Sequence, residues 1–219
     1  MSLNYQQIMR YQELFIEGAL YTLVLTMLAV IIGTVMATAA ALVHEKGPKV
    51  ARQLIRCYIE IIRNTPALIQ IYIVFFVMPQ LGLRLPSFQA AVAALSIYFC
   101  AYAIEIIRSG LYAIPKSQIE AGFCLGLTQW QVFRHVILVS MLRTIYPSYT
   151  SQFILLLLGT SLASQISAEE LFHVAGFVDS RTYRSFEVYS LVSAIYLFMS
   201  LSFKALFALI ARRIFQWPM

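Results

Sequence analysis

GALYTLVLTMLAVIIGTVMATAAALV, residues 18–43, is the stretch that decides the fold class of this chain. It contains 26 residues, and none of them is charged. About 20 predominantly apolar residues are enough for a helix to cross the hydrocarbon core of a membrane. The stretch therefore predicts a transmembrane helix and an integral membrane protein.

The rest of the chain agrees with this class. Of the 219 residues, 60% are hydrophobic and only 12% are charged, whereas about a quarter are charged in a typical soluble domain. Four further apolar stretches cover residues 64–83, 85–104, 144–168 and 188–211, and Lys204 is the only charge within them. A lysine near a helix end can extend its long side chain to the interface. We predict one all-α transmembrane domain over residues 1–219 with five spans, so the two chain ends lie on opposite sides.

Lysine and arginine predict the orientation of these spans, because short cytoplasmic segments are enriched in them. With the N-terminus outside and the C-terminus inside, twelve basic residues lie inside and four outside. The inner twelve are Lys46, Lys49, Arg52, Arg56, Arg63, Arg108, Lys116, Arg134, Arg143, Lys204, Arg212 and Arg213. The outer four are Arg10, Arg84, Arg181 and Arg184. The net charge of +6 is therefore a topology signal and does not form the basic face that nucleic-acid binding needs.

Motifs for chemistry by the chain itself are missing. The sequence has no Gly-x-x-x-x-Gly-Lys-Ser/Thr for a nucleotide, and His44, His135 and His173 lack metal-ligand spacing. The three cysteines, Cys57, Cys100 and Cys124, have no paired spacings, so we expect free thiols. Residues 1–17 do not have the pattern of a cleaved signal peptide. We predict no catalytic residue, no metal site and no cofactor bound by this chain.

A long charged segment, residues 105–143, separates the third and fourth predicted spans. Segments of this length usually have structure or function. Ser117 and Glu120 have the spacing of a capping box, which predicts a short helix from Gln118 to about Leu125. Gly126 would end this helix in the left-handed conformation.

Thr128 and Gln131 form a second capping-box pattern, which predicts a helix running towards Val139. The first helix has one apolar stripe, made of Ile119, Phe123 and Leu127. Such a stripe suits the groove of a partner protein. The physical pattern alone leaves packing on the membrane surface open as the alternative.

This segment also resembles a known family. Ile119-Glu120-Ala121-Gly122 with Gly126 is similar to the Glu-Ala-Ala plus Gly signature in the membrane subunits of bacterial ATP-binding cassette (ABC) importers. Other matching motifs are Gly18–Thr26, Arg63-Asn-Thr-Pro-Ala-Leu-Ile-Gln, Ala101–Arg108, Thr160-Ser-Leu and Arg181–Tyr189. The resemblance covers residues 14–213 and looks like the polar amino-acid branch, whose members take up histidine, glutamate, glutamine, arginine or opines.

The resemblance implies a type I importer fold and a subunit of a larger complex in the bacterial cytoplasmic membrane. The partners would be an ABC ATPase dimer that binds ATP and Mg, a second membrane subunit (itself or a related permease) and an external amino-acid-binding protein. It also implies that a cytoplasmic helix couples the permease to the ATPase. Here that role would fall to Ser117, Glu120, Ala121, Gly122 and Gly126.

Polar residues within the spans are the candidates for a substrate pathway, because they are costly in a membrane and usually functional. We select Arg63, Thr65, Gln152, Thr160 and Ser161. Thr65 could cap a helix that starts at Pro66, or the helix start could attract a substrate carboxylate. Arg63 could pair with that carboxylate or be only a cytoplasmic flank. Small hydroxyls in the fourth span also serve helix packing.

The sequence departs from the family pattern at several positions. Gly122 replaces a usual Ala and Val139 a usual Pro, while Ser151-Gln152 and Leu158-Gly159 replace frequent Asn-Glu and Lys-Asp pairs. The last two changes remove acids, so we expect that this subunit does not itself hold a cationic side chain. It either serves a neutral or acidic amino acid or is the non-binding half of a heterodimer. An opine or another small polar solute is the alternative substrate. An ion-coupled secondary transporter is a rival that would need a carboxylate inside a span, whereas Glu105 lies at the inner end of the third span, where we expect it to face solvent.

Overall fold

A computed structural model describes residues 5–214, and these residues form helices without any strand among them. The first elements in chain order are α1 (Gln6–Met9), α2 (Gln12–Lys46), α3 (Lys49–Arg63), α4 (Ala67–Tyr72), the π-helix η1 (Ile73–Val77) and the 3-10 helix η2 (Met78–Leu81). The others are α5 (Ser87–Tyr112), α6 (Lys116–Cys124), α7 (Gln129–Val132), the π-helix η3 (Phe133–Ile137), α8 (Leu138–Gly159), the 3-10 helix η4 (Thr160–Ile166), α9 (Leu171–Thr182) and α10 (Ser185–Ile214).

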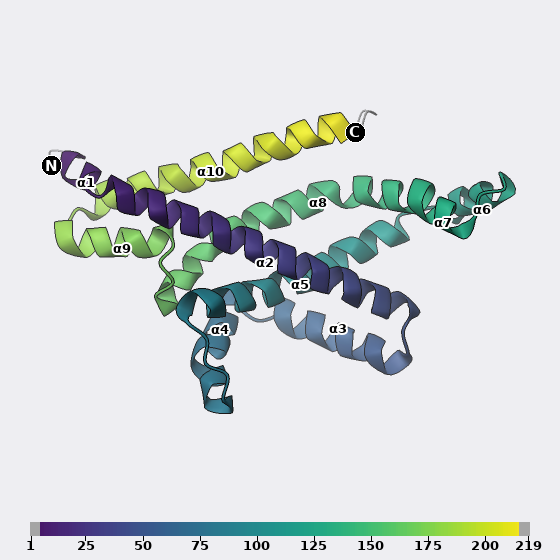
Figure 1. Cartoon of the computed structure of the whole chain (residues 1–219), viewed down its shortest axis with the longest axis horizontal. Helices are drawn as coiled ribbons and strands as arrows, with labels where there is room; N and C mark the ends of the chain where they lie inside the picture. Colours follow the sequence, from purple (N-terminus) through teal and green to yellow (C-terminus); the bar gives the residue numbers. More distant parts are fainter. Residues whose placement is uncertain (1–4, 215–219) are drawn as a thin grey trace.

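The long helices share one direction. α2, α5, α8 and α10 run along the long axis of the molecule, whereas α4 points away from it (Figure 1). The N-terminus, α1 and α9 lie at one end, and α6 and α7 lie at the opposite end (Figure 1). The two ends of the molecule therefore carry different elements, as they would if the long axis crossed a membrane.

Small residues bring α2 and α5 together. Ala29, Gly33 and Ala37 follow one another at four-residue spacing on α2 and are buried. An added Cβ at Gly33 would lie 3.0 Å from a ring carbon of Phe99 on α5, and Phe99 itself is completely buried. Small residues allow such close approach between helices in a membrane, where apolar burial does not drive association.

A buried carboxylate fixes the end that carries α9. Glu170 is 1% exposed and accepts hydrogen bonds from the amides of Phe172 (2.9 Å) and His173 (2.8 Å), so it caps α9. The Tyr196 hydroxyl of α10 donates to the same carboxylate at 2.6 Å. Thr22 of α2 accepts from the amide of Leu171 at 3.1 Å. These hydrogen bonds connect α9 to α10 and α2.

Replacing Glu170 with alanine is expected to lower the free energy of unfolding by about 2 kcal/mol, because a helix cap is lost and a buried hydroxyl is left unpaired. Glu170→Gln keeps an acceptor oxygen and is expected to fall between this variant and the wild type. Thermal unfolding in detergent measures the order. Equal melting of the alanine variant and the wild type would show that the carboxylate does not hold α9.

Three helices of the described residues, α2, α5 and α10, are long and apolar enough to cross a membrane. Two bent pairs also qualify as broken spans: Lys49–Arg63 with Ala67–Leu81, bent by 108°, and Gln129–Ile166 with Leu171–Thr182, bent by 51°. The all-α membrane fold is confirmed, with three spans, or up to five if each bent pair is one span.

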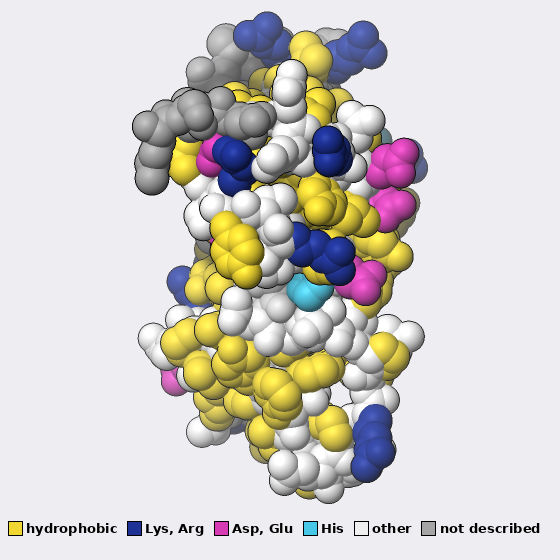
Figure 2. All heavy atoms as spheres, turned by 90° about the vertical axis from the view of Figure 1, so that its left-hand side faces the viewer, with side chains coloured by type: hydrophobic (Ala, Val, Ile, Leu, Met, Phe, Trp, Pro, Cys, Tyr) yellow, Lys and Arg dark blue, Asp and Glu magenta, His cyan; other side chains and the backbone are white. Residues whose placement is uncertain are grey.

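The second predicted span, residues 64–83, differs from the structure. The helical part runs from Ala67 to Leu81 and consists of α4, η1 and η2 in sequence, with three types of helix. This segment exposes apolar side chains, of which Leu81 is 74% exposed. Figure 2, viewed from the end that carries the N-terminus, shows a mostly hydrophobic lower part below a region of mixed charge. An apolar surface of this kind suits lipid or another membrane subunit.

The predicted inner segment, residues 105–143, is also organised differently. α5 continues without a break to Tyr112, and the helix that starts at Gln129 continues through η3 into α8. The second short helix of the prediction is therefore the start of the long helix that contains α8. The stretch has no proline or glycine between Gln129 and Tyr146 that would end a helix. The π-helix η3 therefore joins α7 to α8 without a break.

Candidate functional site

The turn between α3 and α4 is held by side chains. The Thr65 hydroxyl donates to the carbonyl of Ile61 at 2.8 Å and accepts from the Gln70 amide at 2.9 Å. Gln70 also donates to the carbonyl of Ile62 at 2.8 Å. The predicted cap of Thr65 on the following helix is wrong: Pro66 is the N-cap, and Thr65 serves the end of α3. The last carbonyls of a helix lack partners within it, and the Thr65 hydroxyl supplies one.

An open cavity of ≈ 610 Å³ lies beside this turn. We call it the α3–α8 cavity because α3, α5 and α8 supply its walls. Its lining residues are Arg63, Tyr102, Glu105, Ile106, Ser109, Pro147, Ser148, Ser151, Gln152 and Leu155. The structure thus brings together two predicted pathway residues, Arg63 and Gln152, from helices far apart in the sequence.

Opposite charges meet in the α3–α8 cavity. The Arg63 guanidinium lies 3.8 Å from the Glu105 carboxylate and 5.3 Å from the centre of the Tyr102 ring. Glu105 also accepts from Arg108 at 2.6 Å. Both Arg63 and Glu105 are exposed enough, at 44% and 38% of their side chains, to meet a solute. An ion pair of this exposure contributes little to stability by itself.

Gln152 adds an unused donor to the same cavity. The residue is 7% exposed, and its buried amide nitrogen has no hydrogen-bond partner among residues 5–214. A buried donor without a partner costs free energy. A ligand oxygen in the α3–α8 cavity would supply the missing acceptor.

Thr160 and Ser161 lie elsewhere. Thr160 is completely buried and donates to the carbonyl of Leu157 at 2.7 Å. Ser161 donates to the carbonyl of Leu158 at 2.8 Å and lines a separate cavity of ≈ 380 Å³ with Tyr196. Gly159 does not line the α3–α8 cavity. The fourth predicted span is therefore divided between two sites.

Glu105 and Glu170 were not selected from the sequence. Glu105 ends an apolar stretch, and its position suggested solvent, whereas the structure places it against Arg63 and Arg108. The spacing of Glu105 and Arg108, three residues apart, was an available signal. Glu170 lies directly before the apolar start of α9, which is where a capping acid is expected.

At the far end of the molecule, α6 and α7 form the α6–α7 hairpin, residues 116–132. Gly126 adopts φ +77°, as predicted. The amide of Leu127 donates to the carbonyl of Gly122 at 3.2 Å, and that of Gly126 donates to Phe123 at 2.9 Å. This pair of bonds is a Schellman motif, which ends a helix with a left-handed residue.

One of the two predicted capping boxes is confirmed. Thr128 accepts from the amide of Gln131, and the Gln131 side chain accepts from the amide of Thr128 at 2.8 Å. The box at Ser117 and Glu120 is wrong, because α6 begins at Lys116 with Pro115 as its N-cap and no side-chain cap. Pro115 already has the extended backbone of an N-cap residue, which places Ser117 inside the first turn.

The α6–α7 hairpin is closely packed inside and apolar outside. Gly122 is buried, and an added Cβ would lie 3.1 Å from a methyl group of Val132. An alanine here, the usual residue of the resembling family, would require the Val132 side chain to shift. Leu125 and Trp130 are 80% and 66% exposed, and Trp130 stacks on Phe133. The hairpin therefore presents apolar side chains that the rest of residues 5–214 leaves exposed.

The cysteines and the potential metal ligands among residues 5–214 form no further candidate site. Cys57, Cys100 and Cys124 are free thiols, of which Cys100 is buried. Among residues 5–214 no group of three or more His, Cys, Asp and Glu side chains is close enough to hold a metal ion.

Comparison with known proteins agrees with the geometry. Residues 29–216 match the family model described as binding-protein-dependent transport system inner membrane component. The L-cystine transport system permease protein of Bacillus subtilis is 38% identical over 164 residues, which are 75% of this chain and 70% of that protein. The glutamine transport system permease protein of Escherichia coli is 33% identical over 202 residues, 91% of this chain and 92% of that protein.

A solved structure has nearly the same fold. The crystal structure of an amino acid ABC transporter with histidines superposes with a TM-score of 0.89 at 38% identity, covering 97% of this chain and 100% of that chain. The methionine ABC transporter MetNI, in inward-facing conformations, shares the fold with a TM-score of 0.75 at 20% identity, covering 94% and 98% of the two chains. This chain belongs to the family of binding-protein-dependent transport system inner membrane components.

Proposed function

We propose that this chain is the permease subunit of an ABC importer for amino acids, in which it forms the translocation pathway and is driven by a separate ATPase. The relatives that transport cystine and glutamine support an amino-acid substrate. The observation that carries the proposal is the α6–α7 hairpin, which lies at one end of the bundle and exposes apolar side chains (Figure 1).

The hairpin is the coupling element of this proposal. Its Schellman turn at Gly126 and its cap at Thr128 hold a short helix in one orientation, and Phe123 and Leu125 are exposed on it. An apolar helix face of this size fits a groove on a partner protein. The partner is the ABC ATPase dimer, which binds ATP and Mg, and Ser117, Glu120, Ala121, Gly122 and Gly126 form the contact segment.

The α3–α8 cavity is the solute site of this proposal. An amino acid carries a carboxylate and an ammonium group, and the cavity holds Arg63 and Glu105 side by side. Arg63 binds the carboxylate, Glu105 faces the ammonium group, and the free N–H of Gln152 reaches an oxygen of the solute. Thr65 acts by holding the turn next to Arg63, while Thr160 and Ser161 shape the neighbouring part of the pathway.

The family match supports the remaining partners of this proposal. The chain works in the bacterial cytoplasmic membrane with its N-terminus outside and its C-terminus inside. A second membrane subunit, either another copy or a related permease, completes the pathway, and an external amino-acid-binding protein delivers the solute. α6 and α7 then face the cytoplasm, and α9 faces the outside.

An opine is the second candidate solute. The octopine transport system permease protein of Rhizobium meliloti is 35% identical over 212 residues, which are 93% of this chain and 86% of that protein. An ion-coupled transporter has less support, because Glu105 is paired with two arginines and is not a free carboxylate. Copurification of a separately encoded ATPase distinguishes the ABC importer from the ion-coupled transporter.

Uptake of labelled amino acids into proteoliposomes that contain the permease, the ATPase and the binding protein tests the proposal. Uptake is expected to require ATP, and Arg63→Gln is expected to lower it about tenfold, since a charged hydrogen bond is worth about 1.5–3 kcal/mol. Arg84→Gln removes a cation outside the cavity and is the control. Uptake that is driven by an ion gradient without the ATPase would refute the proposal.

A further inference from the structure

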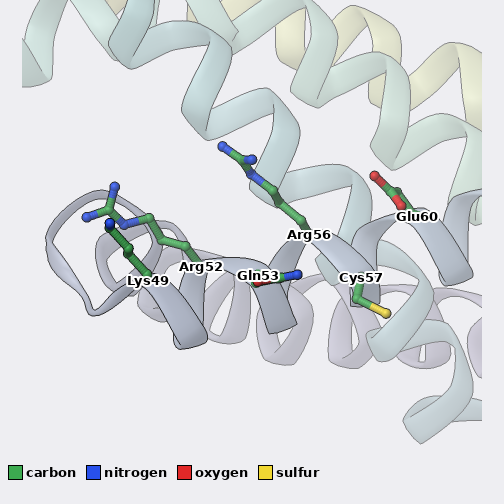
Figure 3. Close-up of a pocket in the computed structure, with 6 residues that line it drawn as sticks. All are labelled: Lys49, Arg52, Gln53, Arg56, Cys57 and Glu60. Atoms are coloured by element: carbon green, nitrogen blue, oxygen red, sulfur yellow. The ribbon is translucent and has the colours of Figure 1, made fainter.

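One face of α3 is strongly basic. Lys49, Arg52, Arg56 and Arg63 recur at three-, four- and seven-residue spacing, which places them on one side of a helix. We call these four residues the basic stripe. Figure 3 shows Lys49, Arg52, Arg56 and Glu60 projecting to the same side of α3, where an open cavity of ≈ 580 Å³ lies. Arg63, at the end of the stripe, lines the α3–α8 cavity, so the stripe extends from that cavity toward the far end of α3.

The helix that carries the basic stripe packs against the apolar bundle. α3 runs back alongside the second half of α2 and also packs on α5 (Figure 1). The Tyr58 hydroxyl donates to the carbonyl of Ile97, within a long apolar stretch of α5, at 2.6 Å, and Ile59 is buried in the core. Fourteen residues separate Lys49 from Arg63, which is about 21 Å along a helix. The stripe therefore follows the bundle over this distance.

Charges beside an apolar bundle need water or partners. Ionisable side chains inside a membrane face the bundle interior or a water-filled cavity, and they often mark the path of a solute. Among residues 5–214, Arg63 has a salt bridge to Glu105, whereas Lys49, Arg52 and Arg56 have none. Glu60 is the single acid on this face of α3. The stripe therefore produces a positive potential in the space that it faces.

We propose that the basic stripe lines a water-filled vestibule below the α3–α8 cavity and favours an anionic solute, an amino acid with a side-chain carboxylate. This inference rests on the proposed function and adds the charge class of the substrate. A zwitterion has no net charge and gains little from the stripe, while a cationic amino acid is repelled. Clefts lined by one sign of charge concentrate ions of the opposite sign and accelerate their movement.

A comparison of the uptake of acidic, neutral and basic amino acids tests the proposal. Uptake of glutamate, glutamine and arginine is measured in proteoliposomes with the ATPase and the binding protein, for the wild type and for Arg52→Gln/Arg56→Gln. Glutamate uptake is expected to fall about tenfold in the double variant, with glutamine uptake within about twofold of the wild type. Arg212→Gln/Arg213→Gln, near the end of α10, removes the same charge from exposed positions outside the stripe and is the matched control.

The outcomes separate the two proposals. Wild-type liposomes that take up none of the amino acids would refute the proposed function itself. Uptake of glutamine or arginine without glutamate would refute only the anionic substrate. Equal losses of glutamate and glutamine uptake in the double variant would show that the stripe serves folding or assembly. A charge preference that weakens as internal salt is raised supports the vestibule, because the Debye length falls from about 10 Å at 0.1 M to about 3 Å at 1 M.

Discussion

Replacing Gly126 with valine is expected to lower ATP-driven uptake at least about tenfold, while the permease still inserts into the membrane. Gly126 has φ +77° at the turn of the α6–α7 hairpin. A β-branched residue is excluded from this region, and forcing a non-glycine residue into a rare conformation costs about 1–3 kcal/mol. An added Cβ would meet no atom within 4 Å. The expected effect is therefore due to the backbone and to the loss of the Schellman bonds.

Two controls separate the backbone from other causes. Gly126→Asn is expected to retain most uptake, because asparagine tolerates the left-handed region. Gly82 also has positive φ, +90°, with open space around its Cβ position, but it lies after η2 and not in the hairpin. Gly82→Val should therefore keep the ratio of uptake to ATP hydrolysis. Loss of coupling in Gly82→Val, or normal coupling in Gly126→Val, would remove the hairpin from the mechanism.

Replacing Gly110 with alanine is expected to lower the free energy of unfolding by about 1–3 kcal/mol, the usual cost of overpacking a core. Gly110 lies near the end of α5, where α5 packs on α8. An added Cβ would lie 2.2 Å from the Cγ2 methyl of Ile145 and 3.0 Å from Met141. Ile145 is buried and its methyl is attached directly to Cβ, so the side chain cannot turn away freely. Thermal unfolding in detergent measures the effect.

A rescue and a control identify the contact. Ile145→Leu removes the branched methyl at nearly constant volume, so Gly110→Ala/Ile145→Leu is expected to recover most of the loss. Gly176→Ala, on α9, places a Cβ where no atom lies within 4 Å, and alanine there should be neutral or stabilising by up to about 1 kcal/mol. A Gly110→Ala protein as stable as the wild type would mean that α5 and α8 can move apart at no cost.

Local patterns were predictable along this chain. The Thr128–Gln131 box and the left-handed Gly126 depend on residues within one helical turn of each other. The long stretches of α2, α5 and α10 were predictable because each helix by itself is long and apolar enough to cross a membrane. The capping prediction at Ser117 failed although its signal was local, because Pro115, two residues earlier, is the N-cap of α6.

The candidate sites were predictable only in part. Arg63 and Gln152 were each selected as polar residues near or within a span, but their meeting in one cavity depends on how α3 and α8 pack against α5. Glu105 was assigned to solvent because the charge ends its apolar stretch. Its salt bridge with Arg63 joins α3 to α5, and no sequence pattern indicates that these two distant residues meet.

The sequence by itself determined that this is an all-α membrane protein with a capped turn at residues 116–132, since hydropathy and capping act over neighbouring residues. Only the tertiary structure decided the place of α3. The sequence predicted its basic residues to be a cytoplasmic flank, because the positive-inside rule counts Lys and Arg and contains no information on which groups they contact. The contacts of Tyr58 and Ile59 hold α3 against α5 and the core, and such packing between distant segments decides whether a charge meets lipid or water.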